Sequence, residues 1–318
     1  YRGRDAVPWA EHATLEQTAQ WLWNGADAVA HLKSSAPQAT AKATIRATAQ
    51  AAAGALPSPA AALAAWHAAA PAPADQPLAL LQAMCGALLG APPPSSLPAH
   101  QRLQQHWRLD DAAAGILRQA LVLCADHELN ASSFAARVVA STGASLHASV
   151  GAGLAALSGP LHGGMTQLIE RQWDEWHAHD SIAPALTALL QQTLLGGKPH
   201  YCAGFGHPLY PQGDPRSQAL LRLLPPERSR QRLLEQVHAH TGLHPSLDYA
   251  LVAVQRALRL PAGAAFTLFA LGRTVGWIAH ALEQRASGQL IRPRAIYTGA
   301  EPSAPEHVRS AGRVVRFR

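Results

Sequence analysis

Apolar residues recur at every third or fourth position along most of the chain, whereas strict alternation of apolar and polar residues is nearly absent. The first spacing is typical of helices with one buried face, and the second is typical of strands. The pattern therefore predicts an all-α fold. It places helices at residues 14–24, 78–89, 110–123, 165–176, 183–195, 217–223, 226–240, 248–258 and 264–282.

Two further stretches carry compositional signals. Residues 35–75 are rich in alanine and contain prolines at positions 37, 57, 59, 71 and 73, which predicts several short helices broken at the prolines. Residues 135–157 are rich in small residues, which predicts a deeply buried helix packed closely against a neighbour. Asp5 and Thr14 are expected to cap short helices near the start of the chain.

Composition narrows the class of protein. The chain has 318 residues, 48% of them hydrophobic, and its net charge of +6 comes almost entirely from arginine. No run of five basic residues occurs, so a small anionic substrate or a phosphorylated cofactor fits the arginines as well as nucleic acid does, and we expect no nucleic-acid partner for this chain. No apolar run of about 20 residues lacks a proline or a charge, which predicts no membrane span.

The ends and the cysteines suggest where the protein works. The chain begins at Tyr1 without a methionine, so we expect a fragment or processed product, and its first residues do not have the pattern that predicts a signal peptide. Cys85, Cys124 and Cys202 have no metal-type spacing and are odd in number. This usage suits a reducing cytoplasm.

The stretch GFGHPLYPQGDPR, from Gly204 to Arg216, has the composition of a functional loop. Gly204 and Gly206 allow tight turns, and three prolines exclude a continuous helix. His207 is therefore expected on a stiff loop, nine positions before an arginine that can bind a carboxylate through two hydrogen bonds. A glycine- and proline-rich loop with a buried, hydrogen-bonded histidine is the alternative.

Two more histidines lie at predicted helix boundaries. His127 stands between Asp126 and Glu128 in CADHELNASSFAAR, where a helix-capping arrangement is the alternative to a binding role. His162 lies in SGPLHGGM, just before a predicted helix. Burial and the positive end of that helix would both favour the neutral imidazole, which could donate a hydrogen bond to a developing oxyanion.

A carboxylate and an arginine stand out in the last third of the chain. Asp248, in HPSLDYAL, begins a predicted helix and could be its N-cap. Arg273, in FALGRTVGWIAH, lies inside an apolar helix. A buried arginine requires an anionic partner, and here that partner could be a ligand.

These segments resemble the citrate synthase family in wording, order and spacing. The resemblance covers GPLHGG, GFGHPLYPQGDPR, SLD, GRTVGWIAHALEQ and IRPRAIYTG, and it extends from YRG at the start to YTG near the end. The wording HPLYP and ADHELNAS is most similar to a bacterial branch. The resemblance implies a helical homodimer in which a large domain, residues 1–164 plus 256–318, and a small domain, residues 165–255, close over shared active sites.

The resemblance also implies residue roles and a reaction. In such an enzyme acetyl-coenzyme A condenses with oxaloacetate, and hydrolysis of the thioester gives citrate and coenzyme A. Acetyl-coenzyme A is a substrate, and no tightly bound cofactor or metal is expected. The implied catalytic residues are Asp248 as the base, His162 as the enol-stabilising donor and His207 as the group that protonates the oxaloacetate carbonyl. The implied substrate-binding residues are His127, Arg216, Arg273 and, from the other subunit, Arg292.

Two alternatives stay open at this point. A 2-methylcitrate synthase would use propionyl-coenzyme A, and one extra methylene is worth only about 1 to 3 kcal/mol in a pocket. A non-catalytic relative would bind a di- or tricarboxylate as a sensor. The sensor is motivated by Pro211, which stands where many family members carry a lysine or arginine for coenzyme A phosphates.

Several other histidines and tryptophans are weaker site candidates, which ordinary structural roles explain. The pair His177 and His179, and the group His238, His240 and His244, have spacings that a metal could use, but no cysteine or carboxylate completes a set. Trp173, Trp176 and Trp277 are expected in the core or at an interface.

Overall fold

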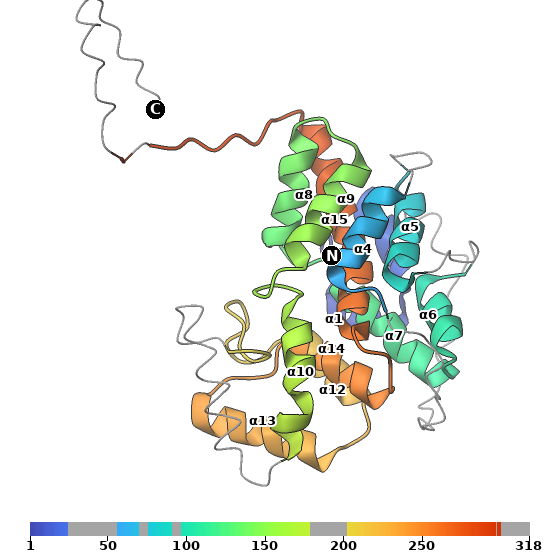
Figure 1. Ribbon diagram of the computed structural model, residues 1–318, viewed down its shortest axis with the longest axis vertical. Coiled ribbons are helices and arrows are strands. Elements are labelled where there is room, and N and C mark those ends of the chain that lie inside the picture. The colour runs from blue at the N-terminus through green and yellow to red at the C-terminus, as the bar shows by residue number, and fades with distance from the viewer. Residues whose placement is uncertain (25–55, 70–75, 91–96, 179–201, 297, 300–318) are drawn as a thin grey trace, which may run out of the picture.

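The computed structural model describes residues 1–24, 56–69, 76–90, 97–178, 202–296 and 298–299. The helices of this part are joined by turns and loops, and two isolated β-bridges are the only β-structure among the described residues, which confirms the all-α prediction. The helices, labelled as in Figure 1, are α1 (Ala6–His12), α2 (Leu15–Asn24), α4 (Pro59–Ala68), α5 (Pro77–Leu89), α6 (Ala99–Trp107), α7 (Asp111–Cys124), α8 (Ala131–Ser141), α9 (Leu146–Leu157), α10 (Met165–Ala178), α12 (Pro215–Leu223), α13 (Arg228–Thr241), α14 (Leu247–Ala257) and α15 (Ala264–Ser287).

Helix α15 is the centre of the molecule. It contacts α2, α5, α7, α8, α9 and α14, and its residues from Ala264 to Ile278 are buried. Gly272 lets it approach α7 closely, because a Cβ at that position would lie 2.6 Å from the Leu121 carbonyl oxygen. Gly153 on α9 does the same for the Trp277 ring, where a Cβ would lie 2.6 Å away. Small residues therefore set the spacing of the core, as predicted for α9.

The prediction of one helix across residues 135–157 is wrong. The structure has two helices, α8 and α9, which pack against each other. Gly143 takes a left-handed conformation with φ of 82°, and Ser145 caps α9 by accepting a hydrogen bond from the Ala148 N–H at 3.1 Å. A glycine turn followed by a serine cap is sufficient to end one helix and start another.

Other helix ends follow the predicted caps. The Asp5 carboxylate accepts a hydrogen bond from the Val7 N–H in α1. Thr14 and Gln17 exchange side-chain hydrogen bonds with each other's backbone N–H at the start of α2, which is a capping box. Helix α6 was not predicted. The predicted helix at 183–195 and most of the alanine-rich stretch lie outside the described residues.

Helices α10, α12, α13 and α14 form the lower part of the molecule in Figure 1. Glu170 in α10 and Gln255 in α14 connect this group to α15. The Glu170 carboxylate accepts hydrogen bonds from the Gly263 N–H and from Gln255 Nε2, and Gln255 Oε1 accepts from the Ala265 N–H at 2.8 Å. The N-terminus of α15 is therefore capped by side chains from two other helices.

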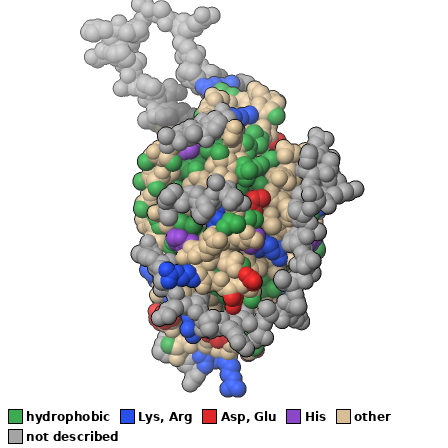
Figure 2. Space-filling view, turned by 90° about the vertical axis from the view of Figure 1, so that its right-hand side faces the viewer, with side chains coloured by type: hydrophobic (Ala, Val, Ile, Leu, Met, Phe, Trp, Pro, Cys, Tyr) green, Lys and Arg blue, Asp and Glu red, His purple; other side chains and the backbone are tan. Residues whose placement is uncertain are grey.

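Helix α15 is also long and apolar enough to cross a membrane by length and composition alone, and 83% of its most apolar window is buried inside the molecule. That burial is typical of a core helix. On the face shown in Figure 2, lysine and arginine side chains occur in several separate groups, with acidic side chains between some of them.

Candidate active site

The loop from Gly204 to Gly213 has tight turns at Gly204 and Gly206, as the sequence predicted. Gly204, Gly206 and Gly213 have φ of 79°, 82° and 108°, values that side-chain-bearing residues rarely adopt. The Gly206 N–H donates to the His244 carbonyl at 2.8 Å, and the Ser246 N–H donates to the Gly204 carbonyl at 2.9 Å. These bonds fix the His207 loop to the segment that leads into α14, where Asp248 lies.

His127 and His207 meet although they come from distant parts of the chain. Their rings lie edge to face with centroids 5.1 Å apart. Tyr210 completes the cluster, since its hydroxyl lies 3.0 Å from His127 Nε2 and its ring centroid lies 5.0 Å from that of His207. The capping alternative for His127 is wrong, because Asn130 caps α8.

Both histidines favour the neutral state. Burial, reinforced by the charges of Arg216 and Arg273, lowers the pKa of His127 to about 3. Burial and the charge of Arg216 also lower the pKa of His207. At neutral pH each ring therefore has one N–H donor and one acceptor nitrogen.

Arg216 is buried and held by Asp214. Its Nε and Nη2 donate to the two Asp214 carboxylate oxygens at 2.9 and 2.6 Å, and Asp214 also accepts from the Arg216 backbone N–H. Only 6% of the Arg216 surface is exposed. The bidentate pair leaves Nη1 as the guanidinium nitrogen without a hydrogen bond to Asp214, so one end of Arg216 is fixed while another remains for a ligand.

Arg273 is buried in α15, with 1% of its surface exposed. Its Nε donates to the Cys124 carbonyl at 2.8 Å, and its guanidinium carbon lies 5.2 Å from the centre of the Phe269 ring. Among the described residues no carboxylate forms a salt bridge with it, so the anionic partner expected from the sequence is not a side chain of this part of the protein. A bound anion would supply it.

His162 lies in the turn that leads into α10. Its Nε2 is 2.8 Å from Ser132 Oγ on α8, and its ring lies edge to face with Phe269 at 5.9 Å. Burial, with the charge of Arg273, lowers its pKa to about 4. Burial, more than the charge of Arg273, thus favours the neutral imidazole.

Asp248 lies in the first turn of α14. The cap of this helix is Ser246, whose hydroxyl accepts from the Tyr249 N–H at 3.4 Å, so the N-cap alternative for Asp248 is wrong. The residue as a whole is partly exposed, but its Oδ1 is buried and has no hydrogen-bond partner among the described residues. Burial raises its pKa to about 7, against the opposing charges of Arg216 and Arg273.

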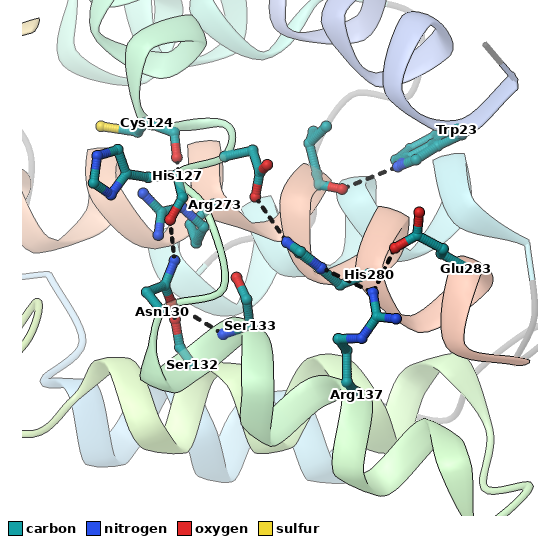
Figure 3. A network of polar contacts seen from close by, with 12 residues as sticks. Trp23, Cys124, His127, Asn130, Ser132, Ser133, Arg137, Arg273, His280 and Glu283 are labelled. Atoms are coloured by element: carbon teal, nitrogen blue, oxygen red, sulfur yellow. Dashed lines mark hydrogen bonds and ion pairs between the residues drawn. The ribbon is translucent and has the colours of Figure 1, made fainter. Parts of the chain in front are cut away.

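The structure thus brings together six of the seven predicted site residues. The charges of Arg216 and Arg273 act on both Asp248 and His127, and Arg273 also acts on His162. Figure 3 shows His127 beside Arg273. Arg292 is the exception, because it lies exposed on the segment that follows α15 and leaves the body of the molecule in Figure 1.

Of the weaker candidates, His179 lies outside the described residues, and the others form no site within them. The His238 and His244 rings pack at 4.5 Å, and His177 bonds to the Trp173 carbonyl at 2.6 Å and the Tyr249 hydroxyl at 3.2 Å. No three histidine, cysteine or acidic side chains of this part of the chain are grouped to hold a metal. The three tryptophans named above are buried, as predicted.

Comparison with known proteins decides the family. The family profile described as "Citrate synthase, C-terminal domain" matches residues 1–294. The chain belongs to the citrate synthase family. Two curated relatives of this family member are "Citrate synthase 2" of Bacillus subtilis, 35% identical over 193 residues, and "2-methylcitrate synthase 1" of Corynebacterium glutamicum, 32% identical over 197 residues. Each alignment covers 58% of this chain, and it covers 50% of the first relative and 49% of the second. The chain thus spans about half the length of the curated relatives it matches.

Solved structures of citrate synthases have the same fold as this chain. The crystal structure of citrate synthase from Thermotoga maritima superposes with a TM-score of 0.69 at 23% identity, over 98% of this chain and 92% of that one. The enzyme from Thermoplasma acidophilum, described as a ternary complex with carboxymethyl coenzyme A and oxaloacetate, superposes with a TM-score of 0.63 over 93% and 88% of the two chains. At this identity the likeness concerns the fold alone.

Four residues of the candidate site were given no role in the sequence analysis. Ser132, Tyr210 and Asp214 contact His162, His127 and Arg216 respectively. The Tyr1 hydroxyl donates a hydrogen bond to the Val122 carbonyl at 2.6 Å, and the charges of Arg216 and Arg273 act on it. The Asp-Pro-Arg triplet was a local signal for Asp214, since an aspartate before a helix can both cap the helix and pair with an arginine in its first turn.

Proposed function

We propose that this chain condenses acetyl-coenzyme A with oxaloacetate and hydrolyses the resulting thioester, giving citrate and coenzyme A. The observation that carries the proposal is Asp248. A carboxylate oxygen is buried there without a hydrogen-bond partner in the part of the chain that the structure describes, and the charges of two buried arginines act on it. Neutral histidines complete the site. Such a buried carboxylate costs stability, and it is expected where a base must take a proton from carbon.

The first step is removal of a proton from the acetyl methyl group. Asp248 accepts this proton, and its raised pKa makes it a stronger base than an ordinary carboxylate. The electron pair moves to the thioester oxygen, where a placed donor must stabilise it at the same moment. His162 is that donor, and because burial keeps the ring neutral, its N–H is a weak acid that stabilises the oxyanion by a hydrogen bond.

The second step forms the new carbon bond. The enol carbon attacks the keto carbon of oxaloacetate, and the keto oxygen takes the N–H proton of the neutral His207. The imidazole regains a proton when water hydrolyses the thioester, because the carboxylic acid that forms there ionises. His207 lies against His127, so the two rings reach the same substrate. Water then cleaves the citryl thioester within the same site, releasing the coenzyme A thiol.

Oxaloacetate is held by its two carboxylates. Arg273 has no carboxylate partner among the described residues, and Arg216 is preset by Asp214, so both are suited to bind a dianion. His127 and, in the proposed homodimer, Arg292 of the partner subunit add further donors. The exposure of Arg292 away from its own site supports a role across the subunit interface.

We propose that residues 165–255 form the small domain and that residues 1–164 plus 256–318 form the large domain. The contacts of α10 with α13 and α14, and of α12 with α14, support this division. His207 and Asp248 then belong to the small domain, and His127, His162 and Arg273 belong to the large one. Closure of the two domains would assemble the catalytic residues around the substrates.

Thiol release measured with both substrates tests the function. We expect release from acetyl-coenzyme A only when oxaloacetate is present, with citrate as the product by mass spectrometry. Absence of release, with oxaloacetate still bound in calorimetry and no binding of millimolar thioester, would instead support the carboxylate sensor.

A 2-methylcitrate synthase is the second candidate. Relatives with that name are nearly as similar to the chain as relatives named citrate synthase, at 32% and 35% identity. Turnover of propionyl-coenzyme A well above that of acetyl-coenzyme A would reverse the order of the two candidates.

A further inference from the structure

The backbone around His127 is strained and held in place. Glu128, the next residue, has φ of 53°, in the left-handed region that non-glycine residues avoid. The Asp126 carboxylate accepts a hydrogen bond from the His127 N–H, and Asn130 Nδ2 donates to the His127 carbonyl at 3.0 Å. Both backbone groups of His127 are therefore fixed by neighbouring side chains.

Asp126 is itself fixed by a residue 154 positions later. His280 on α15 places its Nε2 3.2 Å from Asp126 Oδ1. Burial alone would raise the pKa of Asp126, but the hydrogen bond from His280, the charge of Arg273 and the hydrogen bond from the His127 N–H lower it. The carboxylate is thus ionised and accepts bonds from both sides.

Arg137 on α8 continues this chain of contacts, which Figure 3 shows. Its Nη1 lies 3.3 Å from His280 Nδ1 and 2.5 Å from Glu283 Oε2, and its Nε donates to Gln284 Oε1 at 3.0 Å. Because a guanidinium only donates, His280 Nδ1 must accept, and the proton of the ring lies on Nε2, facing Asp126.

There is little room for this arrangement to shift. Gly276 lies on the same helix as His280, and a Cβ at that position would be 2.7 Å from Asp126 Oδ1. The same loop supplies the Cys124 carbonyl that accepts from Arg273 Nε. One short segment therefore carries His127, orients Arg273 and is anchored to α15 through His280.

We propose that His280 and Arg137 are positioning residues for the substrate carboxylates, acting through Asp126 to hold His127 and Arg273 in place. The inference rests on the proposed function, in which those two residues bind oxaloacetate. Neither His280 nor Arg137 needs to touch substrate. Their loss should weaken oxaloacetate binding specifically, since a displacement of about 1 Å in a binding group can cost up to about 100-fold.

His280→Leu, which removes both ring nitrogens, is the test variant, and His280→Gln, whose Nε2 can still donate to Asp126, is the rescue. The matched control is His100→Leu. His100 is a half-buried histidine of α6, and the charge of Arg118 in α7 acts on it. For His280→Leu we expect the KM for oxaloacetate to rise about tenfold or more, with little change in the KM for the thioester. His280→Gln should recover most of the parent value, and Arg137→Met should resemble His280→Leu.

Two results would overturn the inference. One is a His280→Leu variant whose constants match those of His100→Leu. The other is a fall in kcat, in both substrate affinities and in melting temperature together, without rescue by glutamine, which would indicate a structural role only.

Histidine-selective nitrogen NMR separates this inference from the proposed function. The His127 resonances, identified by their loss in His127→Asn, should move in His280→Leu and not in His280→Gln or His100→Leu. If the parent shows no oxaloacetate-dependent thiol release, the proposed function fails while this readout still decides the positioning role. Unmoved His127 resonances in His280→Leu would contradict it.

Discussion

Ser132 Oγ lies 2.8 Å from His162 Nε2, so a hydroxyl at the start of α8 controls which nitrogen of that imidazole carries the proton. The same hydroxyl lies 2.8 Å from Asn130 Oδ1, and it has a single proton to give. In this structure the proton goes to Asn130 Oδ1, which can only accept, so Ser132 Oγ accepts from the His162 Nε2–H. In the proposed reaction the hydroxyl turns to donate to His162 Nε2, which moves the ring proton to Nδ1, the nitrogen that remains for a substrate. Ser132 thereby prepares His162 to donate to the enol oxygen.

Ser132→Ala should lower kcat by about 3- to 10-fold, the equivalent of one net hydrogen bond of about 0.5 to 1.5 kcal/mol. The neighbouring variant Ser133→Ala is the control, because the Ser133 hydroxyl is buried without a hydrogen-bond partner in the described structure. Steady-state rates with saturating substrates measure the effect. Equal rates for the two variants would show that Ser132 does not assist His162 in catalysis.

The low pKa of His162 makes the protein sensitive to acid. The folded state holds this ring neutral down to about pH 4, whereas in the unfolded chain it takes up a proton near pH 6.5. The unfolded state therefore binds more protons between these values, and stability falls as the pH falls through this window. His162→Asn should reduce the slope of unfolding free energy against pH by up to about 1.4 kcal/mol per unit.

Chemical denaturation at pH 7.0, 6.0 and 5.0 measures that slope. His127, with a pKa of about 3, contributes in the same direction, so the slope should shrink without vanishing in the single variant. A parent protein equally stable at pH 7 and pH 5 would contradict the burial of these two rings in their neutral form.

Local sequence signals predicted the local parts of the structure well. The positive φ values of Gly204 and Gly206, the cap at Asp5 and the presence of a histidine before α10 all depend on neighbouring residues. The resemblance of short sequence motifs to the citrate synthase family then identified six site residues that the fold brings together. Both kinds of prediction depend on short segments whose chemistry is visible in the sequence.

Long-range partners could not be predicted in the same way. The partner of Arg273 is a backbone carbonyl 149 residues away, and the anchor of Asp126 is a histidine 154 residues away. These contacts exist because Gly272 and Gly276 let α15 pack against the end of α7, a feature of the assembled core. The assignment of Asp248 as a possible cap was wrong for a local reason, because a serine two positions earlier competes for that role.

Arg292 tests the proposed sharing of sites between subunits. Arg292→Ala and Asp248→Asn should each be nearly inactive alone, whereas subunits exchanged between them form one intact site in each mixed dimer. Equal mixing makes about half of the dimers mixed, so about a quarter of parent activity should return. Native mass spectrometry confirms the exchange. No recovery after confirmed exchange would show that Arg292 acts within its own chain or not at all.

The central claim is that Asp248 is the base, and thiol release by Asp248→Asn tests it most directly. Asparagine preserves the shape of the side chain but cannot accept the methyl proton, so the rate should fall by roughly 10² to 10⁴. Its melting temperature at pH 8 should equal or exceed that of the parent. Burial raises the pKa of Asp248 to about 7, so ionisation of this carboxyl lowers the stability of the parent as the pH rises from about 4 to about 7, and the full cost is present at pH 8.

Ser246→Ala is the matched control for that measurement, since it removes the cap of the same helix. It should lower stability by about 1 kcal/mol and leave most of the activity. The account predicts loss of rate without loss of stability in Asp248→Asn, and the reverse in Ser246→Ala. An Asp248→Asn enzyme that keeps its melting temperature and turns over within about tenfold of the parent, a barrier difference of only ~1.4 kcal/mol, would contradict the assignment.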